Sequence, residues 1–185
     1  MPSVVDICNR ALQKLGASPI TALTEDSRNA RACNASYEII RDAELRKHPW
    51  SCATSRVQLA PDTATPAFGV DYQYSLPSDF LRILPGNKIT DWQIEGRKLL
   101  TDDGTTLDLR YVKRVTDPND FDALFTDLLA TRLALELCEI ITQSNTKKDF
   151  LTQDYEFSIL EAKRSNAIER VSAETPEDSW ITARL

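Results

Sequence analysis

The stretch FDALFTDLLATRLALELCEIITQ, at positions 121–143, carries apolar residues on nearly every side of a helix. Beyond its first turns only a narrow strip is charged, formed by Arg132, Glu136 and Glu139, and we interpret that strip as a solvated face. A helix that is apolar almost all round is normally buried. The sequence therefore predicts that this helix is the most buried element and the centre of the fold.

Three further helices are predicted around it. The first spans 3–16, with Ser3 and Asp6 as a capping pair and Gly16 as the terminating residue. The second begins in the cap-forming cluster at 24–27, runs to about 47 and stops before Pro49, with Trp50 anchoring its exit in the core. The last spans about 147–172. Their apolar stripes are Val4, Ile7, Cys8, Ala11, Leu12 and Leu15; Ala30, Cys33, Tyr37 and Ile40; and Leu151, Tyr155, Ile159 and Ala162, with Phe150, Phe157 and Leu160 beside the last stripe.

Positions 51–115 change to short alternating segments separated by turn residues, at 56–59, 72–76, 80–84, 91–94, 98–101 and 107–112. The segments at 91–101 form a hairpin about the turn at Glu95 and Gly96. We expect one compact, twisted antiparallel sheet. The fold class is thus α+β, mainly α, in a single domain over 1–185. It has a four-helix core (1–50 and 117–172), an inserted antiparallel β embellishment (51–116) and a C-terminal tail (173–185).

The 185-residue chain has 22 Lys and Arg against 28 Asp and Glu, a formal net charge of −6, with the acidic excess concentrated in 119–185. This sign disfavours a protein that grips nucleic-acid phosphates. No apolar run is long enough to cross a bilayer, and the N-terminus lacks the pattern of a signal peptide. We therefore expect a cytosolic product that contacts no membrane.

Catalytic and metal-binding motifs are sparse. The cysteines at 8, 33, 52 and 138 form no C-x-x-C pair, and Cys8, Cys33 and Cys138 fall on apolar stripes, which favours core roles over a zinc site. His48, the one histidine, stands at a helix end, where a capping or solvent role is preferred to catalysis. We expect no catalytic residue, no metal and no cofactor.

Carboxylates leave one enzymatic alternative open. Two acidic side chains in a cleft could hydrolyse a glycosidic bond. The adjacent pairs are Asp102 with Asp103, Glu136 with Glu139, and Glu177 with Asp178, which we interpret as turn, helix-surface and tail residues.

The tail AETPEDSWITARL, at 173–185, contains Trp180, Ile181 and Leu185. A tryptophan side chain is stabilised by burial and not by exposure to water, so we expect another surface to cover it. Either the tail folds back on its own domain or it anchors to another chain as an interface hot spot, and we favour the second.

Three segments in this order resemble the head-to-tail adaptors of short-tailed bacteriophages, the tail tubular protein A family. They are R-A-L-x-x-L-G…P-I (10–20), R-x-x-P-W (46–50) and Y-x-Y-x-L-P-x-D-x-L-R (72–82). The resemblance extends over nearly the whole chain, up to EDSWITARL at its end.

The resemblance implies a non-enzymatic virion protein, assembled in the host cytoplasm. It would form a twelve-subunit ring between the portal protein and the tail nozzle protein (tail tubular protein B), with DNA passing through the bore without specific binding. A hydrolytic activity on polysaccharides, proposed for some family members, is the alternative. A monomeric cellular binding module unrelated to phage is a further one.

Under this resemblance the tail reaches the portal, through Trp180, Ile181, Arg184 and Leu185, and the β region faces the nozzle, through Asp91, Trp92, Arg97 and Lys98. The stripe of the second helix is flanked by small residues that would let a neighbouring helix approach closely: Ala32, Ala35, Ser36 and Ala43. Small residues of this helix can supply either the core or an interface of the ring. Twelve copies at −6 sum to −72, and an acidic bore would let DNA slide because it repels phosphates.

Overall fold

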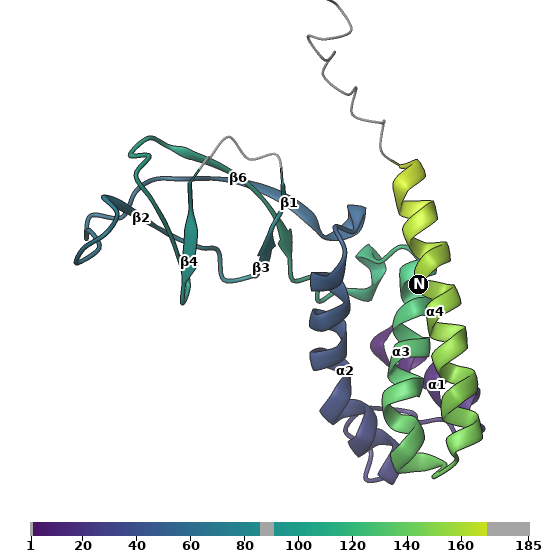
Figure 1. Ribbon diagram of the computed structural model, residues 1–185. Coiled ribbons are helices and arrows are strands. Elements are labelled where there is room, and N and C mark those ends of the chain that lie inside the picture. The colour runs from purple at the N-terminus through teal and green to yellow at the C-terminus, as the bar shows by residue number, and fades with distance from the viewer. Residues whose placement is uncertain (1, 86–90, 170–185) are drawn as a thin grey trace, which may run out of the picture.

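The computed structural model describes residues 2–85 and 91–169. Within them, a helical bundle carries a β unit that projects to one side from the end of α2 (Figure 1). The α+β, mainly α class is confirmed. The helices are α1 (Val4–Leu15), α2 (Arg28–Lys47), α3 (Ala123–Ile141) and α4 (Asn145–Ile168), and the strands are β1 (Thr54–Leu59), β2 (Tyr72–Ser75), β3 (Phe80–Ile83), β4 (Gln93–Glu95), β5 (Lys98–Thr101) and β6 (Leu107–Lys113).

Helix α1 has the ends that its sequence predicts. The Ser3 hydroxyl accepts the Asp6 amide at 3.1 Å, and the Asp6 carboxylate accepts the Ser3 amide at 2.8 Å. This is a capping box, which satisfies two backbone donors at once. Gly16 terminates the helix in the left-handed region, at φ 73°, a conformation that favours glycine.

Helix α2 is capped by Ser27, whose hydroxyl accepts the Ala30 amide, and ends at Lys47 with His48 as its C-cap. The predicted stripe is buried throughout. Trp50 is buried as predicted, and its indole N–H donates to the carbonyl of Glu44 at 2.9 Å.

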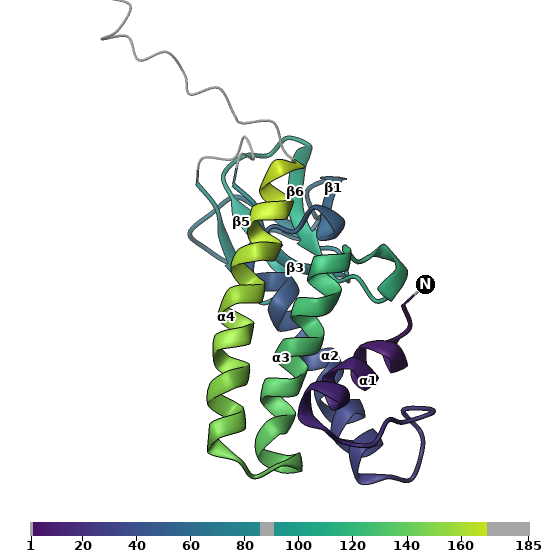
Figure 2. The same ribbon diagram turned by 90° about the vertical axis from the view of Figure 1, so that its right-hand side faces the viewer.

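Helix α3 is the centre of the bundle, as predicted. It packs against α1, α2 and α4, and in Figure 2 it stands between α4 and the α1–α2 pair. Its Asp122 cap accepts the amides of Leu124 and Phe125, and a short 3₁₀ turn at Pro118–Asp120 precedes it. Its largest fully buried side chains are Phe125, Leu128, Leu129, Leu133 and Leu137.

The expectation of a single sheet is wrong. The strands form two three-stranded antiparallel sheets, in the orders β1-β6-β3 and β2-β5-β4. Side chains from both sheets build one apolar cluster, separate from the helical core: Tyr74, Leu76, Leu99, Leu107, Leu109 and Tyr111. Two short sheets bury this cluster between them, which a single flat sheet cannot do.

Arginines join the β unit to the bundle. The Arg46 guanidinium donates to the carbonyl of Leu81 in β3, and the Arg82 guanidinium returns a bond to the carbonyl of Lys47 at 3.4 Å. Arg114, after β6, pairs with Asp42 of α2 at 2.6 Å. We call these three contacts the arginine junction. They fix the end of α2 to β3 and to the exit of β6.

Tyr37 yields a stability prediction. Its hydroxyl is buried and has no hydrogen-bond partner within 2–85 and 91–169, and burial raises its pKa to about 12. Tyr37→Phe should raise the unfolding free energy by about 1 kcal/mol at pH 7, since an unsatisfied buried hydroxyl is removed.

The advantage of Tyr37→Phe should grow above pH 10. In the unfolded chain the Tyr37 hydroxyl ionises near its ordinary pKa of 10.0, whereas in the folded chain it stays neutral up to a pKa of about 12. Between these two values, rising pH stabilises the unfolded state of the wild type but not that of the Phe variant. Urea unfolding of both proteins at pH 7 and pH 10.5 checks this. An equal difference at both pH values would contradict it.

Candidate interaction surfaces

The predicted nozzle-facing residues lie on the β4–β5 hairpin but not at one point. Asp91 and Trp92 lie at its open end, and the carbonyl of Asp91 accepts the Thr101 hydroxyl at 2.7 Å. Arg97 and Lys98 lie at its turn. Arg97 donates to the carbonyl of Pro77, whereas Lys98 pairs with Asp62 and donates to the Ser75 hydroxyl at 2.7 Å. Both cations therefore hold the hairpin against neighbouring residues of the chain.

Strand β4 is the edge of its sheet, and its apolar side chains remain accessible. Trp92 is 44% exposed and Ile94 is 39% exposed. Trp92 directly precedes the strand and Ile94 lies within it. We call Trp92 and Ile94 the hairpin patch. An exposed edge strand with apolar side chains is a surface suited to pairing with another chain.

A second apolar surface lies on α4 and was only partly anticipated. Phe150, Phe157 and Leu160, predicted beside the buried stripe, are 67%, 66% and 54% exposed, and Ile168 is 85% exposed. At 3.6 residues per turn, positions 150, 157 and 168 fall on one line, about 120° from the buried stripe. We call Phe150, Phe157, Leu160 and Ile168 the α4 ridge. The angle between this line and the buried stripe is the feature of the sequence that predicts an outward orientation for these residues.

The outer face of α2 differs in character. Ala30 belongs to the core and Ala32 packs against it, whereas Ala35 and Ala43 are exposed. Ile39 is 72% exposed on the same side of the helix. In Figure 1, α2 and α4 lie on opposite sides of the bundle.

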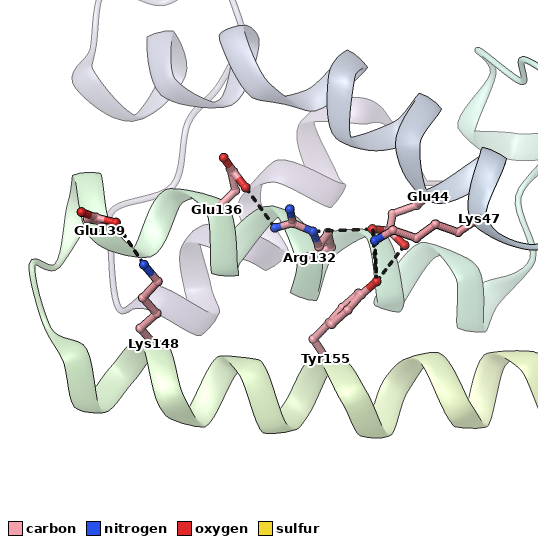
Figure 3. Close-up of polar contacts among 7 residues, drawn as sticks. All are labelled: Glu44, Lys47, Arg132, Glu136, Glu139, Lys148 and Tyr155. Carbon is pink, nitrogen blue, oxygen red and sulfur yellow. Dashed lines mark hydrogen bonds and ion pairs between the residues drawn. The ribbon is translucent and has the colours of Figure 1, made fainter. Parts of the chain in front are cut away.

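A buried carboxylate links three helices (Figure 3). Glu44 of α2 has a side chain only 1% exposed; it accepts the hydroxyl of Tyr155 from α4 and pairs with Lys47 and with Arg132 of α3, at 3.5 Å for Arg132. Lys47 also donates to the Tyr155 hydroxyl at 2.9 Å. Burial raises the pKa of Tyr155, so its hydroxyl stays protonated and can donate to Glu44.

The charged strip of α3 is therefore less solvated than expected. Arg132 is half-buried and pairs with Glu136 at 3.0 Å as well as with Glu44. Glu139 is exposed and pairs with Lys148 of α4 at 3.0 Å (Figure 3). Glu44 itself was missed, although it continues the buried stripe of α2 four residues after Ile40.

The cysteines and His48, which were considered as metal ligands or catalytic groups, pack against other residues of the chain. Cys8, Cys33 and Cys138 are buried, as predicted, and residues 2–85 and 91–169 contain no group of three or more possible metal ligands. His48 lies 4.7 Å from the Trp50 ring, centroid to centroid, and its Nε2 is 3.1 Å from the side-chain nitrogen of Asn166. It packs at the end of α2, as a cap would.

Three depressions on the described surface contain carboxylates. They are Asp6, Asp127 and Asp154, one in each depression, and the depressions of Asp6 and Asp127 share Arg10. Asp127 pairs with Arg10 and Asp154 pairs with Lys14 at 2.7 Å, while Asp6 caps α1. Asp102 accepts the Asp71 amide and Asp103 caps a turn through Thr105. Glu177 and Asp178 lie outside the described residues.

The predicted portal-reaching residues, Trp180, Ile181, Arg184 and Leu185, also lie outside the described residues. No helix in the described part of the chain is both long enough and apolar enough to cross a bilayer. Comparison of the sequence with models of known protein families and with curated proteins finds no match.

Proposed function

We propose that this chain is a structural head-to-tail adaptor of a phage particle, forming a ring between a portal protein and a tail nozzle protein through which DNA passes. One observation carries the proposal. Two exposed apolar surfaces, the hairpin patch and the α4 ridge, lie on units with separate cores that the arginine junction holds together. A protein that holds two partners at a fixed separation needs two binding surfaces on units that are rigidly joined.

Two of the three motifs behind the family resemblance support this proposal because each supplies an arginine of that junction. Arg46 of R-x-x-P-W bonds to β3, and Arg82, which closes the third motif, bonds back to α2. In the first motif, Gly16 ends α1, and the neighbouring Asn9 side chain bonds both the amide and the carbonyl of Ile20. Arg46 and Arg82 thus hold the β unit against the bundle, whereas the first motif shapes the end of α1.

The outer faces of α2 and α4 support self-association into a ring. A ring requires one face of each subunit to fit the opposite face of the next. The α4 ridge supplies four exposed apolar side chains, and the outer face of α2 supplies Ile39 between the exposed Ala35 and Ala43. A formal charge of −6 per subunit keeps DNA from adhering in the bore.

The surroundings of the carboxylates favour this structural role over the hydrolase alternative. A glycosidase needs two acidic groups facing one cleft. Glu44 is enclosed by Lys47, Arg132 and Tyr155, whereas Asp127 and Asp154 are paired with Arg10 and Lys14 and Asp6 caps α1.

Removing residues 174–185 should lower the affinity for the portal protein about tenfold or more, because the deletion removes the aromatic and aliphatic anchors of the tail. The truncated subunit should keep its circular dichroism spectrum. Surface plasmon resonance against immobilised portal measures the affinity. Trp92→Ala, in the hairpin patch, is the control and should leave portal binding unchanged. Equal affinity of the full and truncated chains would refute the tail assignment.

A further inference from the structure

Two of the buried cysteines lie against each other across the interface between α1 and α2. Cys8 lies on the buried stripe of α1 and Cys33 on that of α2, and both are fully buried in the helical core. The Cys8 thiol donates a hydrogen bond to the Cys33 sulfur. The two sulfurs are therefore neighbours, and an S–S bond of about 2 Å needs only a small movement of the side chains.

The loop between the two helices fixes this approach. The Asn9 side chain, directly after the α1 cysteine, accepts the amide of Ile20 at 2.8 Å and donates to its carbonyl at 2.9 Å. Asn29, about one turn before the α2 cysteine, donates to the carbonyl of Ser18 at 2.9 Å. Each helix is thus bonded to the connecting loop close to its cysteine, which holds the two thiols side by side.

The other two cysteines have different surroundings. The sulfur of Cys138, in α3, lies 3.3 Å from the hydroxyl oxygen of Thr142. Cys52 is half-buried, and burial raises the pKa of its thiol. In the described part of the chain, Cys8 and Cys33 form the one hydrogen-bonded pair of thiols. They are therefore the pair whose geometry suits a disulfide.

The hydrogen bond also makes the two sulfurs chemically unequal. It raises the pKa of Cys8, which burial raises further, and it lowers the pKa of Cys33 against the opposing effect of burial. The thiolate is the nucleophilic form of a cysteine. Cys33 is therefore the sulfur that attacks an oxidant, and Cys8 is the thiol that completes the disulfide.

We propose that Cys8 and Cys33 form a disulfide that joins α1 to α2 when the protein meets a peroxide, and that this bond stabilises the bundle. The Cys33 thiolate attacks one oxygen of hydrogen peroxide, which breaks the O–O bond, gives a sulfenic acid and releases hydroxide. The Cys8 sulfur then attacks the sulfenic sulfur, and the hydroxyl group leaves with the Cys8 proton as water. The two thiols lose two electrons in total, and one hydrogen peroxide becomes two water molecules.

A small oxidant suits this site because both thiols are fully buried. A reducing cytoplasm keeps such pairs as thiols. One consequence rests on the proposed function: a particle released from the cell leaves that environment. The disulfide would then form in the adaptor after assembly and not before it.

Oxidation of the full chain under native conditions tests the proposal. The protein is reduced, freed of reductant, exposed to hydrogen peroxide and then alkylated in urea, and its peptides are identified by mass spectrometry. We expect the peptides that contain Cys8 and Cys33 to be joined. The melting temperature should rise by about 5–10 °C, because a cross-link across roughly 25 residues restricts the unfolded chain, and dithiothreitol should reverse the rise.

Two matched substitutions provide the controls. Cys33→Ala should abolish both the joined peptides and the rise in melting temperature. Cys138→Ala removes an equally buried thiol and should leave both unchanged. Full alkylation of Cys8 and Cys33 after peroxide treatment, linkage of either to another cysteine, or a disulfide without a rise in melting temperature would each overturn the proposal. Because no portal protein is present, none of these results bears on the adaptor proposal.

Discussion

Phe125→Ala should lower the unfolding free energy by about 3–5 kcal/mol. Phe125 is fully buried in α3, with ring centroids 5.0 Å from Trp50 and 5.1 Å from Phe121. Its removal leaves a cavity where the bundle meets the segment that leads into the β unit. Urea denaturation followed by circular dichroism measures the change.

Phe157→Ala is the matched control for that experiment. The same atoms are deleted from a side chain that is 66% exposed on the α4 ridge, so the loss should be under about 1 kcal/mol. If both variants lost the same stability, Phe157 would belong to the core, and the ridge would not be a surface open to a partner.

Glu44→Ala should cost about 2–3 kcal/mol. The substitution removes the acceptor for Tyr155 and the counter-charge of Arg132 and Lys47 in a place that water reaches poorly. Breaking one partner of a buried pair leaves the others unpaired. The value is below that of a fully buried pair because the Lys47 side chain is 45% exposed. Thermal unfolding at neutral pH measures the effect.

Glu139→Ala provides the comparison on the same bundle. Its ion pair with Lys148 joins α3 to α4, but the Glu139 side chain is 78% exposed, so the change should cost less than about 1 kcal/mol. Equal losses in the two variants would show that Glu44 contributes no more than a surface pair, and the linkage of α2, α3 and α4 through this carboxylate would be rejected.

The helices could be predicted from the sequence because their signals are local. Ser3 with Asp6, Gly16, and the apolar spacing of α1 all lie within one element, and the structure places each as expected. The burial of α3 follows from its composition alone.

The arrangement of the strands could not be predicted in the same way. Pairing of β6 with both β1 and β3 joins residues far apart in the sequence, so nothing local distinguishes two sheets from one. The arginine junction is also non-local. Nothing in the sequence shows that Arg46 of α2 bonds to β3 or that Arg82 of β3 bonds to α2.

For the interaction surfaces, the sequence indicated which residue types suit an interface, but it did not show which of them already bind other groups of the same chain. The sequence singled out Trp92, and its side chain is accessible. Arg97 and Lys98 carry the right charge for an interface, but both are bound to groups of their own chain. The α4 ridge was taken for the border of a buried stripe because exposure depends on which neighbours pack against α4.

Electron microscopy of the chain mixed with its candidate portal protein tests the adaptor proposal most directly. The account predicts rings of this chain stacked on the portal, with the β units on the side away from it and an open central channel. Mass measurement of the isolated chain cannot replace this experiment, since the portal can template a ring of otherwise monomeric subunits. Portal particles that bind none of the chain, together with cleavage of a polysaccharide by the free protein, would contradict the account.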